Sequence, residues 1–337
     1  MTIREDVHLC TDVQNDMVNS LEHKRILYRA AKAYYDDGLT QQQIAERFGL
    51  SRVKISRLLR EAREDKVVQI TIVSPPGSNA DVERQLESMY GLKEALVVTC
   101  SASDPGTVVG ELGPAAAACL SRCLQGKEVV ALSWGTAVLS VVNALSPMNL
   151  PDVRVVQFLG GLGELEAETH GAELARRMAQ TLGAKPRLIH APGIVKDKTI
   201  RDALAMDPQV ADTLDLAGRA DVALVGIGAF EPGGTLLSGG NALTPDEIDS
   251  LRSCGVAGDI ALQFFDGDGR RVNHPVNDRI VGTDLEKIRQ IPRVIGVAGG
   301  AAKTRVIRAA LRGGLINVLV TDDQTAKRLL ESGDSPG

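Results

Sequence analysis

The sequence predicts two domains, an N-terminal helix-turn-helix and a larger, mainly parallel α/β domain. The first observation behind this fold class is the length, because 337 residues exceed one ordinary domain. The second is the composition, with 44% hydrophobic but only 3% aromatic residues, which indicates a core of Ala, Val, Leu and Ile. The third is the pattern: two short helices around a glycine at residues 39–62, then buried strands alternating with helices.

The polar, acidic residues 1–20 are expected to form a flexible tail, either disordered or loosely helical. A helix-turn-helix domain is expected over residues 21–73. Its first helix carries apolar residues at helical spacing and ends near Asp37-Gly38. This helix should support the two that follow.

Two short helices are predicted between residues 39 and 62. Thr40 is a candidate N-cap, and Gln43 three residues later completes a capping box. Gly49 supplies the left-handed turn that ends the first helix, since glycine enters that conformation without steric cost. Ser51 is the N-cap of the second helix, whose apolar residues Val53, Ile55, Leu58 and Leu59 are expected to face inward.

The outer face of the second helix is cationic. Residues 21–66 carry eleven Lys and Arg against seven Asp and Glu, about +4 in a chain whose net charge is −5. A segment of net positive charge in an otherwise acidic chain is typical of a DNA-binding module attached to another domain. We therefore expect this helix to enter the major groove of operator DNA, with an ordinary helical hairpin as the alternative. The candidate DNA-binding residues are Thr40, Gln41, Ser51, Arg52, Lys54, Ser56 and Arg57.

The β-branched run at residues 67–73 predicts a short strand and suggests a winged variant of the helix-turn-helix. Residues 74–80 are the expected linker, because Pro75, Pro76 and Gly77 disfavour both helix and sheet. A second, ligand-binding domain is expected over residues 81–334. Apolar strands separated by helices predict a mainly parallel sheet covered on both faces. These strands are predicted at residues 94–99, 128–132, 154–159, 187–189, 222–227, 258–265, 293–297 and 318–321.

Glycine-rich turns follow four of these strands, at the edge of a parallel sheet where ligands bind. The turn at residues 133–136 runs into a helix whose free amides could hold an anion. Gly299-Gly300 precedes Lys303 at the start of a helix, which resembles a phosphate cradle. Each turn alone has an ordinary explanation as a tight strand-to-helix connection. Four of them together favour a shared pocket.

An acidic residue, Asp259, interrupts an apolar stretch, where it either binds ligand hydroxyls or caps the next element. With it, the candidate ligand-binding residues are Ser133, Trp134, Gly135, Thr136, Gly160, Gly161, Asp259, Gly299, Gly300 and Lys303. None of the glycine-rich turns has the spacing of a dinucleotide or ATP site, so no cofactor is expected.

Other functional classes find little support in the sequence. No arrangement of Ser, His and acidic residues points to catalysis, and the five cysteines lack metal-site spacing. We therefore expect no catalytic residue and no bound metal. The longest apolar stretch is interrupted by polar residues, and the first twenty residues lack an apolar core. The expected location is the cytoplasm, without a membrane partner.

Three segments of the chain resemble the SorC family of bacterial transcriptional regulators, also described as DeoR-type sugar-binding regulators. They are LTQQQIAERFGLSRVKISRLLREA at residues 39–62, GDI at 258–260 and VAGGAAKTRVIRAALRGGLINVLVTD at 297–322. The resemblance implies an effector domain similar in fold to glucosamine-6-phosphate deaminase and ribose-5-phosphate isomerase, but not catalytic. It also implies a phosphorylated sugar or polyol effector, and homodimers or homotetramers on operator DNA.

By residue matching, the resemblance places the effector's phosphate near Gly135, Thr136, the Gly299-Gly300 turn and Lys303. Sugar hydroxyls would meet Asp259 and the Gly160-Gly161 turn, and Trp134 would face the sugar carbons. The expected function is a DNA-binding regulator, a repressor of a carbohydrate or polyol operon. One alternative is a sugar-phosphate isomerase or deaminase fused to a helix-turn-helix. Another is an interaction module that binds no small molecule.

Overall fold

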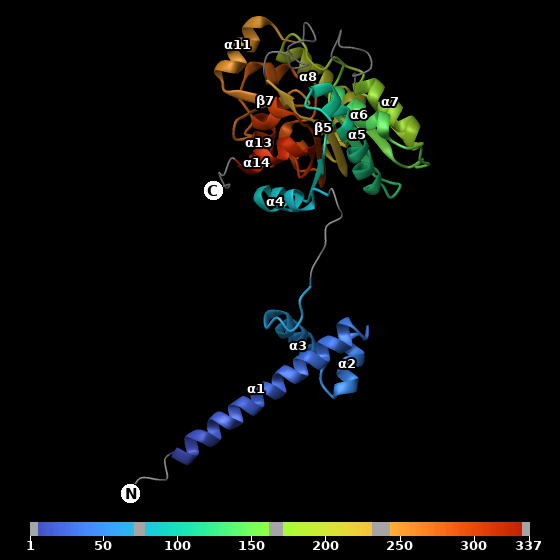
Figure 1. Cartoon of the computed structure of the whole chain (residues 1–337). Helices are drawn as coiled ribbons and strands as arrows, with labels where there is room; N and C mark the ends of the chain where they lie inside the picture. Colours follow the sequence, from blue (N-terminus) through green and yellow to red (C-terminus); the bar gives the residue numbers. More distant parts are fainter. Residues whose placement is uncertain (1–5, 71–77, 162–170, 231–242, 332–337) are drawn as a thin grey trace. The chain divides into compact units, whose positions relative to one another are not determined.

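The computed structural model describes residues 6–70, 78–161, 171–230 and 243–331, with side chains from residue 21 onward (Figure 1). The chain divides into two compact units, Met1–Pro75 and Pro76–Gly337. The division falls inside the proline-rich segment 74–80. Each unit has its own hydrophobic core, so each is described by itself.

The first unit consists of α1 (Asp6–Tyr35), α2 (Gln41–Phe48) and α3 (Arg52–Glu64). The predicted capping box is confirmed: the Gln43 amide donates to Thr40 Oγ1 at 3.3 Å, and the Thr40 amide donates to Gln43 Oε1 at 2.9 Å. Gly49 ends α2 with a φ of 66°, as its position predicts. Ser51 Oγ accepts the Lys54 amide at 3.2 Å and begins α3. Residues within the turn itself, Gly49 and Ser51, thus determine where α2 ends and where α3 begins.

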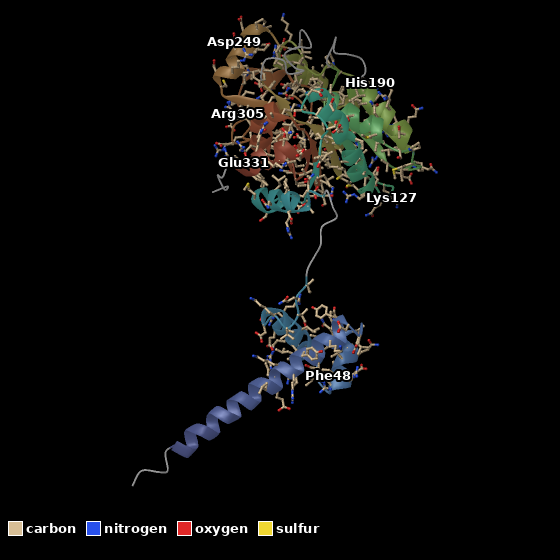
Figure 2. The ribbon with its side chains drawn as sticks, in the orientation of Figure 1. Phe48, Lys127, His190, Asp249, Arg305 and Glu331 are labelled. Atoms are coloured by element: carbon tan, nitrogen blue, oxygen red, sulfur yellow. The ribbon has the colours of Figure 1, made fainter. Side chains whose placement is uncertain are left out.

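All three helices contribute to one small core. Its buried members are Leu27, Ala30, Ala31, Ala33, Ile44, Ala45, Ile55, Leu58, Leu59 and Ala62. The half-buried Phe48 packs against this core, and the Arg29 guanidinium lies 5.2 Å from the centre of its ring (Figure 2). α1 therefore supports the two helices of the motif.

Two sequence expectations for this unit differ from the structure. Val53 is 80% exposed and does not face inward, because it lies two residues before the buried Ile55, about 200° away around the helix. The expected tail is a different case: α1 begins at Asp6, so residues 6–20 adopt the helical one of the two expected states, in a segment that contains neither proline nor glycine. Residues 67–70 are not a strand, because the Val68 amide donates to Ala62 O at 2.9 Å and closes the end of α3. The rest of the expected wing strand lies outside the described residues.

The second unit contains a seven-stranded sheet with the order β1-β10-β9-β5-β2-β3-β4, all of whose neighbouring pairs are parallel. This confirms the predicted mainly parallel α/β fold. After β2 the chain builds β3 and β4 on one side, and β5, β9 and β10 lie on the other, so the strand order reverses between β2 and β5. These strands are β1 (Glu94–Val98), β2 (Val129–Leu132), β3 (Arg154–Gln157), β4 (Lys185–Arg187), β5 (Val222–Gly226), β9 (Arg293–Val297) and β10 (Val318–Asp322).

Helices cover both faces of this sheet, and each face has its own buried cluster. One face is covered by α5 (Pro105–Arg122), α6 (Thr136–Ala144) and α7 (Gly171–Leu182), which lie together in Figure 1. The helices on the other face include α4, α9, α11, α12, α13 and α14. The bounds of the remaining helices are α4 (Ala80–Tyr90), α8 (Lys198–Met206), α9 (Pro208–Gly218), α11 (Pro245–Ser253), η2 (Pro275–Arg279), α12 (Leu285–Arg289), η3 (Ala301–Lys303), α13 (Thr304–Arg312) and α14 (Asp323–Glu331).

The segment predicted as one strand at residues 258–265 is instead an antiparallel hairpin. β7 (Val256–Ile260) and β8 (Gln263–Asp266) join β6 (Gly228–Ala229) in a separate three-stranded sheet. Ala261 and Leu262 form the turn with φ angles of 52° and 62°. Asp259 Oδ2 accepts the Leu262 amide at 3.0 Å and stabilises this left-handed turn. An unbroken apolar run does not reveal such a reversal.

Candidate ligand pocket and DNA-binding face

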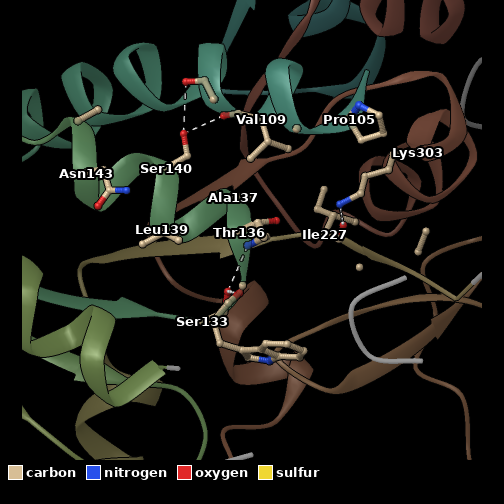
Figure 3. A pocket seen from close by; sticks show the side chains of 18 of the residues that line it. Pro105, Val109, Ser133, Thr136, Ala137, Leu139, Ser140, Asn143, Ile227 and Lys303 are labelled. Atoms are coloured by element: carbon tan, nitrogen blue, oxygen red, sulfur yellow. Dashed lines mark hydrogen bonds between the residues drawn. The ribbon is translucent and has the colours of Figure 1, made fainter. Parts of the chain in front are cut away.

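A cavity of about 780 Å³ opens at the carboxyl ends of β2 and β5, where the strand order of the sheet reverses (Figure 3). This is the place where open parallel sheets bind ligands, because loops from adjacent strands leave toward opposite faces there. Ser133, buried at the end of β2, ties the two strands together. Its amide donates to Leu224 O at 3.0 Å, and its hydroxyl oxygen accepts the Gly226 amide at 3.2 Å.

The first wall of the cavity is the N-terminus of α6. Gly135 precedes the helix with a φ of 106°, a conformation that favours glycine, and no side chain caps the helix. The first amides of α6 therefore have no capping partner, and Thr136 and Ala137 at this end line the cavity. Such a helix end attracts an anion through its free N–H groups and its dipole. The half-buried Trp134 lines the same wall.

The second wall presents the Lys303 ammonium group. Nζ donates to Ile227 O at 2.9 Å, in the connection that follows β5 (Figure 3). Burial lowers the pKa of Lys303, and the Asp259 carboxylate opposes that shift. An ammonium group has three protons to donate, and this contact uses one. The group can therefore bind an anion in the cavity without moving far.

Asp259 forms the acidic part of the cavity. Burial raises the pKa of this carboxyl to about 6, against the lowering effects of the Leu262 amide and the Lys303 charge. Gly228 faces it across the β6–β7 pair, and a Cβ built at Gly228 would lie 2.2 Å from Asp259 Oδ1. A side chain at position 228 would therefore displace the carboxyl from its place at the edge of the cavity. A carboxylate held in this way can accept hydrogen bonds from ligand hydroxyls.

Six of the ten predicted ligand residues line this one cavity: Ser133, Trp134, Gly135, Thr136, Asp259 and Lys303. Gly160 and Gly161 do not line it. Their turn packs against the loop at Ala191, where a Cβ on Gly160 would lie 2.3 Å from Ala191 O. The Gly161 amide donates to the same carbonyl at 2.9 Å. Gly160 thus permits a close backbone contact, whereas a Cβ on Gly161 would meet no atom within 4 Å. Residues 162–170 after them lie outside the described residues.

Gly299 and Gly300 do not line the cavity either. The Gly300 amide donates to Asp322 Oδ2 at 2.6 Å and to Thr325 Oγ1 at 3.0 Å. A Cβ on Gly299 would lie 2.5 Å from the same Asp322 oxygen. This turn leads directly into η3, which carries Lys303. The two glycines therefore hold the backbone that presents the lysine.

One part of the cavity has no counterpart among the residues singled out in the sequence. It extends between α5 and α6 along Val109, Gly110, Pro114, Leu139 and Ala144. We call these five residues the apolar arm. The two helices approach so closely that a Cβ on Gly113 would lie 2.2 Å from Ser140 Oγ. The small residues repeated along α5 are the sequence feature that could have indicated this part of the cavity. Ordinary packing between helices explains the same residues equally well.

The candidate DNA-binding residues on α3 share one exposed face. Ser51, Arg52, Lys54, Ser56 and Arg57 are all exposed, whereas Ile55, Leu58, Leu59 and Ala62 are buried. Arg57 Nε lies 3.3 Å from Glu61 Oε1. Among the described residues, Arg52 and Lys54 form no ion pair, so their charges are available to phosphates. Thr40 is exposed and Gln41 is half-buried at the start of α2.

No helix among the described residues is both long and apolar enough to cross a membrane. Across the same ranges, no group of three or more His, Cys, Asp or Glu side chains is arranged to hold a metal ion.

Comparison with known proteins identifies both units. Residues 74–331 match the family model of a sugar-binding domain, and residues 22–65 match region 4 of sigma-70 factors. The deoxyribonucleoside regulator of Bacillus subtilis is 30% identical over 309 residues, which are 92% of this chain and 98% of that protein. The transcriptional regulator LsrR of Klebsiella pneumoniae is 34% identical over 315 residues, which are 92% of this chain and 94% of that protein.

A solved structure agrees with these relatives. The crystal structure of the full-length sorbitol operon regulator SorC from Klebsiella pneumoniae matches with a TM-score of 0.71 and 33% identity. The match covers 91% of this chain and 98% of that one. These relatives are regulators, which decides against the alternative of an enzyme fused to a helix-turn-helix. The chain belongs to the SorC family of DNA-binding transcriptional regulators, with a sugar-binding domain after its helix-turn-helix.

Proposed function

We propose that this chain represses a carbohydrate or polyol operon, and that a phosphorylated sugar or polyol in the cavity controls its binding to operator DNA. One observation carries the proposal: the Lys303 ammonium and the uncapped N-terminus of α6 line the same cavity as the Asp259 carboxylate. A phosphorylated polyol has an anionic end and a hydroxylated body. Opposite charges in one cavity can recognise both.

Each residue then has a distinct role. The phosphate binds the amides at Gly135 and Thr136 and the Lys303 ammonium, since these groups offer charge-assisted donors. Hydroxyls donate to Asp259. Trp134 packs against the carbon skeleton of the effector. The Gly160-Gly161 and Gly299-Gly300 turns act by positioning neighbouring backbone, with the second turn presenting Lys303.

Regulation requires that the effector distinguish two states of the protein. We propose that the chain acts as a homodimer or homotetramer whose helix-turn-helix units bind adjacent half-sites of the operator. A ligand shifts such an equilibrium only by its difference in affinity between the DNA-binding arrangement and the other one. The α3 face, through Ser51, Arg52, Lys54, Ser56 and Arg57 with Thr40 and Gln41, provides the contact with DNA.

The effector claim is tested with Trp134, the only tryptophan of the chain. Its fluorescence is titrated with a panel of phosphorylated sugars and polyols and with their unphosphorylated counterparts. We expect a saturable response to a phosphorylated compound and none to its counterpart. Lys303→Met should weaken that binding by about 1.5–3 kcal/mol, the typical value for hydrogen bonds to charged groups.

Lys127→Met is the matched control, because Lys127 is exposed and lies outside the cavity lining (Figure 2). An equal response to both members of a pair would contradict the phosphate claim. An unchanged dissociation constant in Lys303→Met would remove the lysine from the site. Repression is tested separately with a reporter under the chain's own operator. Reporter expression should rise when the gene for this chain is deleted, and a fall would identify an activator.

A further inference from the structure

Val53 is the most exposed large hydrophobic residue of the described part of the first unit, with 80% of its surface accessible. It is the second residue of α3, directly after Arg52 and before Lys54. Single exposed apolar side chains are common on protein surfaces and alone indicate nothing. The position of Val53 on α3, and not its exposure alone, indicates a function.

The helical phase places Val53 in the middle of the candidate DNA-binding face. The buried residues of α3 define its inner face, and Val53 lies on the opposite side, one turn before Ser56 and Arg57. Its immediate surroundings are therefore hydroxyls and cations. A β-branched residue in the first turn also has low helix propensity, so neither local structure nor the core accounts for it.

Charge decides which partner fits this surface. A second copy of α3 meeting the first face to face would bring Arg52, Lys54 and Arg57 against the same cations. Like charges directly opposed are destabilising. DNA carries the complementary charge, and residues early in a recognition helix contact base edges. The surface around Val53 therefore fits a major groove and not another protomer.

We propose that Val53 contacts the C5-methyl group of a thymine and so specifies a T·A pair in the operator. Thymine is the one base that presents a methyl group in the major groove, and apolar side chains recognise it by contact. Guanine and cytosine present donors and acceptors there, which would lose water against a Val side chain without gaining a partner. The inference rests on the proposed placement of α3 in the major groove.

The experiment separates the methyl group from the rest of the base. Operators for the full chain are first selected from a pool of random duplexes. Each thymine of a selected site is then replaced singly by deoxyuridine, which lacks only the methyl group. We expect one replacement in each half-site to weaken binding by the wild-type protein about four- to tenfold, the value of one buried methyl contact.

Val53→Ala provides the second half of a double-mutant cycle. It should bind the thymine and deoxyuridine operators equally, because it no longer reaches the methyl group. Val53 is exposed, so the variant should keep the thermal stability and the effector response of the wild type. These two measurements show that any change arises at the DNA interface.

Two results would overturn the inference. One is a selected operator without thymine in the α3 contact region, and the other is an identical loss on deoxyuridine replacement in both proteins. Arg57→Ala distinguishes this failure from a wrong placement of α3. Weaker DNA binding by Arg57→Ala without coupling at Val53 rejects only the thymine contact. Unchanged DNA binding by Arg57→Ala and Val53→Ala together rejects α3 as the recognition helix.

Discussion

At the scale of single residues, Asp259 joins function to stability. The folded protein binds a proton at this carboxyl more tightly than the unfolded chain, because burial raises the pKa from 3.8 to about 6. Between these two values the native state holds more protons than the unfolded state. The free energy of unfolding contributed by Asp259 therefore falls as the pH rises through this window, and it is constant above about pH 6. At neutral pH the ionised Asp259 therefore lowers the free energy of unfolding. Such a cost is expected of a residue that is kept for binding and not for stability.

Asp259→Asn should remove this pH dependence. Relative to the wild type, the variant should become more stable between pH 4 and 6, by about 3 kcal/mol at most for a pKa shift of about two. Urea unfolding followed by Trp134 fluorescence measures the difference, because this tryptophan reports only on the second unit. Parallel stability curves for the two proteins across that range would contradict the assignment.

Individual residues also show where a sequence is informative. Thr40, Gln43 and Ser51 were predictable because a cap depends on a few neighbouring residues. Val53 was assigned to the wrong side, since apolar residues at positions 53, 55, 58 and 59 resemble one stripe until the helical angle is measured. The glycines at 160 and 299 were predicted to contact the ligand, but backbone at Ala191 and the Asp322 carboxylate lie against them instead. A glycine indicates that something comes close to the backbone, but not whether it is a ligand or another part of the protein.

At the scale of elements, the connection between β9 and α13 shows how the fold presents the Lys303 side chain to the cavity. Asp322 at the end of β10 accepts hydrogen bonds from the Gly300 amide, the Thr325 amide and the Thr325 hydroxyl. Burial alone would raise the pKa of Asp322, but these hydrogen bonds lower it. The Lys303 amide in turn donates to Gly300 O at 2.9 Å. One carboxylate thus fixes the turn on which Lys303 stands.

Asp322→Asn should destabilise the second unit by about 1–3 kcal/mol, the typical effect of leaving a buried polar group unsatisfied. It should also weaken effector binding, because the turn before Lys303 loses its support. Thermal unfolding and the Trp134 titration measure the two effects. Asp249→Asn is the control: Asp249 is exposed (Figure 2) and pairs with Arg252 at 3.0 Å, and surface pairs contribute about 0–1 kcal/mol. Equal effects of the two substitutions would argue against a special role for Asp322.

Strands were the elements that the sequence predicted best. Each strand of the main sheet lies within two residues of a predicted one. Six of the seven contain a short apolar run between turns, which is the pattern of a parallel strand. The exception is β4 (Lys185–Arg187), which is exposed and shares only Arg187 with the strand predicted there. The hairpin at residues 256–266 was mistaken for one such strand. Its reversal depends on Ala261 and Leu262 adopting positive φ angles, which the residue types do not suggest.

At the scale of the whole molecule, the two units have separate cores. The buried cluster of the first unit contains only residues between Leu27 and Ala62, and the clusters of the second begin at Leu86. Nothing in either core requires residues of the other. Domains of this kind can fold alone.

A fragment spanning residues 76–337 should therefore fold, bind the effector with the dissociation constant of the full chain and fail to bind operator DNA. Calorimetry, the Trp134 titration and a gel-shift assay measure these three properties. A fragment that aggregates or loses effector affinity would show that the first unit contributes to the second. The full chain titrated without DNA is the reference.

The apolar arm between α5 and α6 has a consequence for how such regulators diverge. In the proposed function, a helix terminus and a lysine bind the phosphate of any phosphate monoester, so this end of the cavity contributes affinity but does not distinguish one effector from another. Under the same proposal, discrimination among effectors falls to the apolar arm, none of whose residues belongs to the sheet or to the turns that bind charge: Val109, Gly110, Pro114, Leu139 and Ala144. Substitutions on α5 and α6 would then exchange one phosphorylated effector for another and leave the phosphate-binding groups unchanged.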